Sequence, residues 1–238
     1  MWTKYRVRWD GLNHLCGSVP ADPKLVEAWL TARRPTARPP DARSIDELQA
    51  EVFDSLAAPD DFDTTECAYL TFRRDKGILA MRAATIRAHL KDCARVLSSY
   101  MGRLEGAKHF STRIVDCVYP DPAVYWVPIL RPDGSPVTEP DRTVEKGIRV
   151  QTPRGPRSAL KKFDAIEPWA MEFTLHILQI QGSKPVRNPE TKQMEQRTIP
   201  SVSIKDLSTV MAYGSTHGYA GERGDGAGKY TFTITEEV

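Results

Sequence analysis

A glycine-rich segment near the C-terminus constrains the fold of this chain more than any other feature. Six of its fifteen glycines lie between positions 214 and 228. Glycine adopts positive φ readily and lets a second backbone or a ligand approach closely, so this density predicts a tight loop. The loop follows a predicted helix and opens a strand over 230–235. Dinucleotide-binding and P-loop signatures have the opposite order and are excluded, whereas a plain flexible connection remains an alternative.

Composition indicates an ordinary globular protein. The 238 residues are 40% hydrophobic and carry a net charge of +2, and this length suffices for a substantial core. We expect one elaborated domain over 1–238, with insertions at 33–66 and 100–165. No apolar run approaches the length of a membrane span, and the first residues lack a signal-peptide core. These features predict a cytoplasmic protein with no membrane partner.

The four cysteines are scattered along the sequence. Cys16, Cys67, Cys93 and Cys117 form no CxxC pair. Zinc sites and disulfide frameworks require closer and more regular spacing. We therefore predict free thiols, no metal and no cofactor.

Charge is segregated along the chain although the net charge is small. Residues 33–43 are rich in arginine and proline, and residues 44–72 hold eight acids and no base. Residues 146–162 hold six cations and no acid. Such segregation predicts a cationic groove even in a nearly neutral protein.

Alternation of apolar and polar residues predicts the first strand and a late one. Over positions 4–9, apolar residues alternate with Lys4, Arg6 and Arg8, which indicates a half-buried strand whose open face is basic. A second alternating run spans 169–177.

Helical spacing is clearest in the middle of the chain. Apolar residues share one face over 86–97, while Arg87, Lys91 and Arg95 form a ridge on another. The ridge is a candidate phosphate contact, and a solvated helix face is the alternative. Capping signals predict further helices over 22–32 and 44–56.

Shorter elements follow from local signals. Strands are predicted at 67–72, 114–119, 124–130 and 146–152, the last ending at the Pro-rich run 153–157, which should not continue a ladder.

The region before the glycine loop contains a polar stretch and a helix. The polar residues 182–198 are expected to form a long mobile hairpin or loop. Ser203 and Asp206 form a capping-box pattern ahead of a helix that should end at Gly214.

The resulting order is strand, helix, inserted middle, strand, helix, glycine loop, strand. Two strand–helix–strand halves around an antiparallel sheet are what a ferredoxin-like domain requires. We therefore predict an α+β protein with a ferredoxin-like antiparallel sheet, helices on one face and an inserted middle region.

The helix, the spaced glycines and the final strand together resemble the RAMP superfamily, the RNA-binding proteins of CRISPR effector complexes. The glycines concerned are Gly214, Gly218, Gly221, Gly224, Gly226 and Gly228. Segments 17–23, 78–87 and 167–169 are also similar to a group of small bacteriophage proteins, which implies a host cytoplasmic location. The RAMP resemblance implies contact with RNA through the loop and a cationic sheet face. Glu222 and Asp225 depart from this pattern because they dilute the charge of the loop.

Nucleic-acid binding is therefore the leading functional hypothesis, with a single strand as partner and a homo-oligomer or larger complex as the assembly. The aromatic residues Trp9, Phe72, Tyr219 and Tyr230 are candidates for stacking on unpaired bases if exposed, although burial is the better expectation for Trp9. The candidate binding residues are Lys4, Arg6, Arg8, Arg74, Arg87, Lys91, Arg95, Lys146, Arg149, Arg154, Arg157, Lys161, Lys162, Gly218, Gly221, Arg223, Gly224 and Lys229.

Two other classes of function remain open. Some RAMP proteins cleave RNA without metal through a histidine, and His14 and His217 are the candidates here, each against the simpler interpretation of a structural histidine. The acids at 60–63 fit a solvated turn better than a two-metal site. The third class is a protein-assembly component in which acidic and basic blocks pair between subunits.

Overall fold

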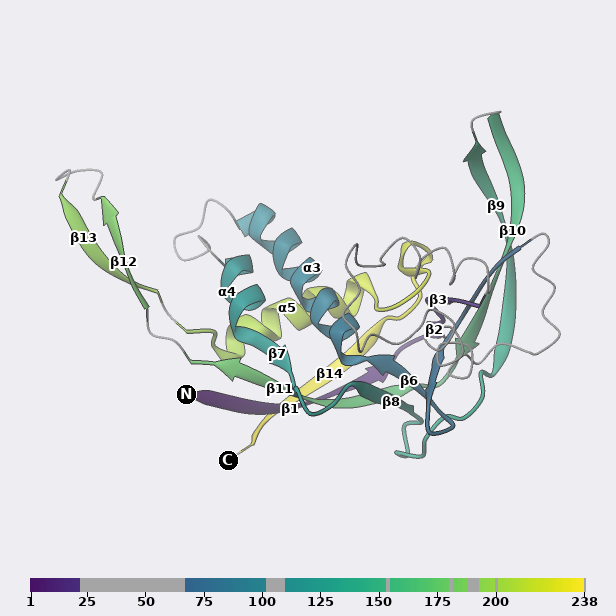
Figure 1. Cartoon of the computed structure of the whole chain (residues 1–238), viewed down its shortest axis with the longest axis horizontal. Coiled ribbons are helices and arrows are strands. Elements are labelled where there is room, and N and C mark those ends of the chain that lie inside the picture. The colour runs from purple at the N-terminus through teal and green to yellow at the C-terminus, as the bar shows by residue number, and fades with distance from the viewer. Residues whose placement is uncertain are drawn as a thin grey trace, which may run out of the picture.

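The computed structural model describes residues 1–21, 67–101, 110–152, 155–179, 182–187, 193–199 and 201–237. These residues form an α+β protein with two main sheets and three helices (Figure 1). The helices predicted at 22–32 and 44–56, and the insertion predicted at 33–66, lie outside the described residues.

The larger sheet has seven strands, and every pairing within it is antiparallel. Its strand order is β14-β1-β11-β8-β6-β5, with β7 also paired to β11. The β7 and β8 strands both fall inside the predicted insertion at 100–165, so part of that region belongs to the main sheet. The strands are β1 (Trp2–Gly11), β5 (Arg73–Asp75), β6 (Ile78–Arg82), β7 (Val118–Pro120), β8 (Trp126–Leu130), β11 (Ala170–Leu178) and β14 (Tyr230–Glu237).

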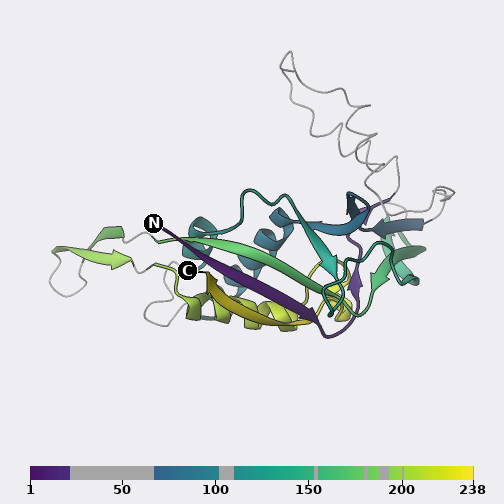
Figure 2. The same ribbon diagram turned by 90° about the horizontal axis from the view of Figure 1, so that it is seen from below.

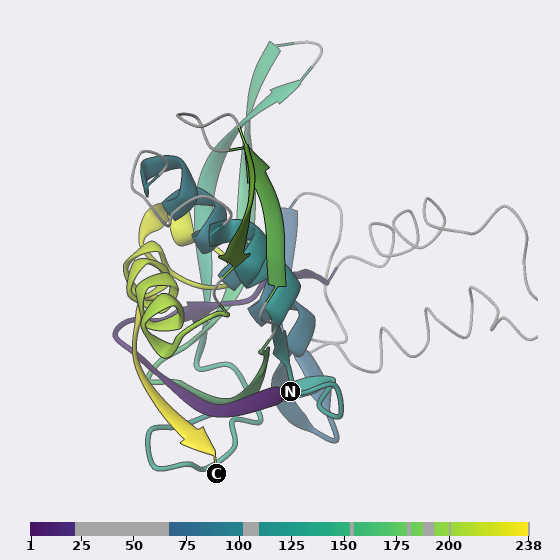
Figure 3. The same cartoon turned by 90° about the vertical axis from the view of Figure 1, so that its left-hand side faces the viewer.

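The helices α3 (Ala83–Met101), α4 (Phe110–Cys117) and α5 (Ile204–His217) cover one face of this sheet (Figures 1 and 3). The opposite face carries no described helix, and Figure 2 shows β1, β11 and β14 lying in front of the helices. Alternation along β1 places Tyr5, Val7 and Trp9 in the core, as the sequence predicted. None of the three described helices is long and apolar enough to cross a membrane.

Two predicted boundaries at helices are wrong. Residues 114–119 were expected to be a strand, but Ile114 lies in α4, because Phe110 and Ile114 are four residues apart and bury one helix face together. The helix predicted to end at Gly214 continues to His217 and is capped by Gly218 at φ 87°. Gly214 is buried inside the helix, where an added Cβ would lie 2.6 Å from the Tyr230 hydroxyl.

The second sheet lies at one end of the molecule and contains a long hairpin. The β4 strand pairs parallel with β10, and β9 pairs antiparallel with β10 to form a hairpin that extends beyond the helices (Figures 1 and 3). The prediction that 153–157 ends the ladder is wrong for its last residues, because β10 begins at Gly155 and Pro156 pairs with Gln151. The strands are β2 (Leu15–Cys16), β3 (Val19–Pro20), β4 (Cys67–Thr71), β9 (Arg142–Thr152) and β10 (Gly155–Ile166).

A separate two-stranded hairpin extends from the opposite end (Figure 1). Its strands, β12 (Gly182–Arg187) and β13 (Met194–Ile199), lie where the sequence predicted a long hairpin or loop. A short 3-10 helix, η1 (Arg223–Asp225), lies within the glycine loop.

An aromatic cluster fills the core beneath the glycine loop. Trp9 stacks on Tyr230 at 4.3 Å between ring centroids and meets Phe173 and Tyr219 edge-on at 4.9 and 5.1 Å. Trp9, Phe72, Tyr219 and Tyr230 are each at most 2% exposed. The stacking role considered for these four rings is therefore wrong, because their faces are used in the core.

Candidate nucleic-acid interface

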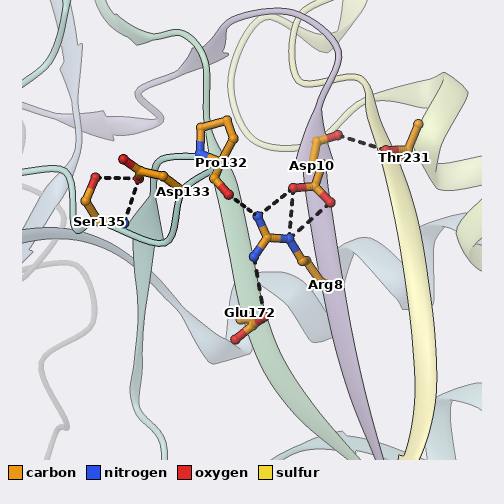
Figure 4. A network of polar contacts seen from close by, with 7 residues as sticks. All are labelled: Arg8, Asp10, Pro132, Asp133, Ser135, Glu172 and Thr231. Carbon is orange, nitrogen blue, oxygen red and sulfur yellow. Dashed lines mark hydrogen bonds and ion pairs between the residues drawn. The ribbon is translucent and has the colours of Figure 1, made fainter.

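The open face of the large sheet carries the predicted basic row of β1, but two of its three cations have acidic partners. Arg8 donates to Asp10 Oδ1 at 2.9 Å and to the Pro132 carbonyl oxygen at 2.8 Å, and lies 3.5 Å from Glu172 (Figure 4). The hydrogen bond to Asp10 is the main reason that the pKa of Arg8 is raised. This network makes Arg8 a structural link between β1 and its neighbours.

Arg6 and Lys4 are more available on the same face. Arg6 lies 3.1 Å from Glu237, yet its side chain is 65% exposed. Lys4 is exposed and makes no ion pair with another described residue. The basic character of this face is therefore concentrated at the N-terminal half of β1.

The cationic ridge of α3 is divided by the structure. Arg87 donates to the Val115 carbonyl oxygen of α4 at 2.9 Å, and its guanidinium carbon lies 3.9 Å from the ring centroid of Tyr119. Lys91 is half-buried and Arg95 is exposed, and neither pairs with a described acid. Arg87 thus helps to pack α3 against α4, and Arg95 is exposed.

The base of the β9–β10 hairpin is fastened to the glycine loop by ion pairs. Glu222, whose side chain is 9% exposed, pairs with Lys161 and lies 3.6 Å from Lys146. Lys146 also pairs with Asp225, and this contact lowers the pKa of the Asp225 carboxyl. The two acids that dilute the charge of the loop therefore hold the hairpin in place.

The other predicted cations of this region differ in their surroundings. Lys162 pairs with Glu145 at 2.6 Å, and Arg149 is exposed on β9. Arg157 lies in β10 opposite Val150, and Arg154 lies outside the described residues. Arg149 and Arg157 therefore lie in the part of the hairpin beyond the ion pairs at its base.

Outside the hairpin, Arg74 bonds to the segment between β8 and β9. It donates to the Thr138 carbonyl oxygen and to the Glu139 carboxylate, both at 2.6 Å. This candidate therefore has a local structural partner.

The glycine loop is closely packed against other backbone. A Cβ on Gly228 would lie 2.0 Å from the Tyr219 carbonyl oxygen, and one on Gly218 would lie 2.3 Å from the Ala227 carbonyl oxygen. A Cβ on Gly221 would lie 2.4 Å from the Gly17 carbonyl oxygen. Gly224 has open space around it. Most of these glycines therefore serve to fold the loop onto itself and onto the β2 region.

A cavity of about 360 Å³ lies beside the loop. Asp92 is its acidic residue and lies 3.4 Å from Arg223 and 3.8 Å from His217. The Thr85 and Tyr219 hydroxyls lie 2.7 Å apart at the same site. The lining includes Ser18, Thr85, His89, Asp92, Tyr219 and Arg223.

The two histidines predicted as catalytic candidates lie in different settings. His217 is at the end of α5, stacked on Tyr213 and close to Asp92. His14 lies after β1, and its carbonyl oxygen accepts a hydrogen bond from Gly228 N at 2.9 Å. Of the two, His217 lies next to Asp92, which lines the cavity.

Sequence reasoning missed His89 as a site residue. Its Nε2 lies 3.0 Å from the Tyr230 hydroxyl, and burial lowers the pKa of His89 to about 3. The spacing of His89 and Asp92, three residues apart on one helix, was the available signal.

The described thiols and acids form no group with the arrangement of metal ligands. Cys16, Cys93 and Cys117 are free, and burial raises the pKa of Cys16 and of Cys93 to about 12. Within the described ranges, no three His, Cys, Asp or Glu side chains are grouped to hold a metal ion.

Comparison with known proteins adds no assignment: no protein-family model matches the chain, and no curated protein matches it either.

Proposed function

We propose that this protein binds single-stranded RNA or DNA without catalysis, with the β9–β10 hairpin as its main phosphate contact. One observation carries the proposal: the β9–β10 hairpin extends beyond the helices (Figure 1), and Arg149 and Arg157 lie in its outer part, beyond the ion pairs at its base. Lysine and arginine that neutralise phosphates supply affinity that is independent of sequence. A projecting arm of this kind reaches a flexible strand without steric hindrance from the body.

The arrangement of the large sheet supports a finer fold proposal. In the sheet order β14-β1-β11-β7, α3 lies between β1 and β7 in the chain, together with β2–β6 and α4, and α5 lies between β11 and β14, after β12 and β13. In the sheet, β11 lies between β1 and β7, and β1 lies between β11 and β14. This interleaving favours a ferredoxin-like unit and, with the glycine loop, kinship with RAMP proteins.

The test is fluorescence anisotropy with single-stranded RNA, single-stranded DNA and duplex DNA across a salt series. We expect salt-sensitive binding to a single strand, because released counterions make phosphate contacts weaken as salt rises. Absence of binding to all three at low salt would overturn the proposal. Self-association without oligonucleotide binding would favour the protein-assembly hypothesis.

A paired variant locates the contact. Replacing Arg149 and Arg157 with glutamine should weaken binding and reduce the slope of log affinity against log salt by about 0.7 for each phosphate that the variant no longer neutralises. The matched control replaces Lys76 and Lys205, both exposed and outside the hairpin, with glutamine. An equal loss of affinity in the two proteins would show a general charge effect instead of a hairpin contact.

Metal-independent RNA cleavage is a second candidate, favoured by the grouping of His217, Asp92 and Arg223 beside a cavity. An imidazole near a carboxylate can transfer a proton, and a guanidinium can stabilise a phosphate charge. His217→Ala would abolish cleavage and leave anisotropy unchanged, whereas His14→Ala would retain cleavage. Intact RNA after incubation with the wild-type protein would refute this candidate.

A further inference from the structure

A second, larger cavity lies at the edge of the large sheet, where α3 begins. It has a volume of about 620 Å³ and is lined by residues that include Trp2, Arg87, Tyr119, Asp121, Val124 and His176. Pockets of a few hundred cubic ångströms with mainly apolar walls and few polar groups are typical small-ligand sites. This volume suits one nucleoside-sized group.

The walls contain an accessible aromatic ring. Trp2 is 50% exposed, in contrast to the fully buried Trp9 and Trp169. It meets Tyr119 edge-on at 5.9 Å and lies 6.3 Å from the His176 ring. A half-exposed indole held at its edge by two rings has a face available for stacking.

Two polar nitrogens at this cavity are buried without a hydrogen-bond partner among the described residues. They are Arg87 Nε and His176 Nε2. His176 Nε2 lies 3.9 Å from Asp121 Oδ1, which is beyond hydrogen-bond distance. Arg87 and His176 both line the cavity, so other atoms of these two side chains supply polar groups to its wall.

Charge selects the class of ligand. Arg87 supplies a permanent positive charge, and the first turn of α3, at Ala83 and Ala84, forms another part of the wall and contains no acid. An aromatic face, a ring nitrogen and a cation together match a nucleobase with its phosphate.

The cavity also adjoins the exposed cations of β1. Trp2, Lys4 and Arg6 occupy every second position of β1 and so share one face, and Lys4 pairs with His176 of β11 in the sheet register. A strand whose phosphates follow Lys4 and Arg6 therefore passes the cavity. We propose that this cavity receives one unpaired nucleobase, stacked on Trp2 and within reach of His176, with its phosphate near Arg87. The assignment to a base of the bound strand rests on the proposed function.

Two oligonucleotides separate base from phosphate contacts. Trp2→Ala should weaken binding to a single-stranded oligonucleotide about tenfold, the usual size of a stacking contribution, without changing the salt slope. It should leave binding to an abasic oligonucleotide of the same length unchanged. Trp2→Phe should restore most of the affinity, and Tyr100→Ala, which removes another exposed aromatic ring, is the control. Equal affinity of wild type and Trp2→Ala for the base-bearing strand would overturn the proposal.

Mononucleotides separate this proposal from the wider one. Millimolar AMP, GMP, CMP or UMP should quench the fluorescence of the wild-type protein but not of Trp2→Ala. Quenching without any oligonucleotide binding would keep the cavity as a free-nucleotide site and reject the proposed function. Salt-dependent oligonucleotide binding that Trp2→Ala leaves intact, with no quenching, would reject the cavity and keep the hairpin contact.

Discussion

At the scale of single residues, His89 makes stability depend on pH. Burial lowers its pKa from 6.5 to about 3, so between these values the unfolded chain binds a proton that the folded protein does not. The contribution is complete above about pH 6.5 and is lost as the pH falls toward about 3.

Replacing His89 with phenylalanine removes this proton uptake. We expect the unfolding free energy of the variant to fall less steeply between pH 6 and 4, by up to about 1.4 kcal/mol per pH unit. Urea unfolding of both proteins across this range measures the difference. Parallel pH profiles would contradict the assignment.

Gly228 tests the packing of the loop at the same scale. It has φ +71°, and a Cβ there would lie 2.0 Å from a backbone oxygen of Tyr219. Gly228→Ala should therefore destabilise the protein by about 2 kcal/mol or more, measured by thermal unfolding. Gly224→Ala is the control, because Gly224 has open space, and it should change stability by less than about 0.5 kcal/mol.

Residue patterns predicted which side chains are buried better than they predicted which side chains form ion pairs. Alternation correctly placed Tyr5, Val7 and Trp9 in the core, because strand geometry fixes which side chains share a face. Arg8 pairs with Asp10 of its own strand and with Glu172 of β11. The second pair depends on the register between β1 and β11, which a single sequence does not specify. Charge alone therefore overestimated the free cations.

At the scale of elements, the N-terminus of α5 is set by a local sequence signal. Ser203 Oγ accepts a hydrogen bond from Asp206 N at 3.1 Å, and Ser203 N donates to the Asp206 carboxylate at 2.9 Å. This is the predicted capping box.

Replacing Ser203 with alanine leaves a helix N-terminal N–H without its acceptor. We expect a loss of about 1 kcal/mol in unfolding free energy, measured by denaturant titration. Ser208→Ala, a change inside the same helix, should have almost no effect. A similar loss in both variants would indicate that the cap contributes nothing specific.

Elements that depend on distant packing were not predictable. The β-branched run at Ile114 suggested a strand, but burial against the neighbouring helix and sheet selected α4. The Pro-rich run 153–157 similarly argued against the β9–β10 hairpin. The pairing of these two strands is stabilised by a distant contact, where β10 joins β4. The candidate cavities could not be predicted for the same reason, because Trp2 and Arg87 are far apart in the sequence and line one cavity only in the folded protein.

At the scale of the whole molecule, Glu222 couples the glycine loop to the projecting hairpin. Its carboxylate is nearly buried between Lys146 and Lys161, so Glu222→Gln leaves Lys161 without its partner. We expect a loss of about 1–2 kcal/mol in stability. The same change adds positive charge at the base of the hairpin, so oligonucleotide affinity at low salt should rise if the hairpin binds phosphates.

These opposite effects distinguish coupling from simple damage. A variant that only disrupts folding loses stability and affinity together, whereas Glu222→Gln should lose stability and gain affinity, with a steeper salt dependence. Glu139→Gln makes the same charge change at an exposed partner of Arg74 and is the matched control. Thermal unfolding and anisotropy on the three proteins provide both readouts. If Glu222→Gln remained folded but lost affinity, the result would indicate that the ion pairs hold the hairpin in its binding position.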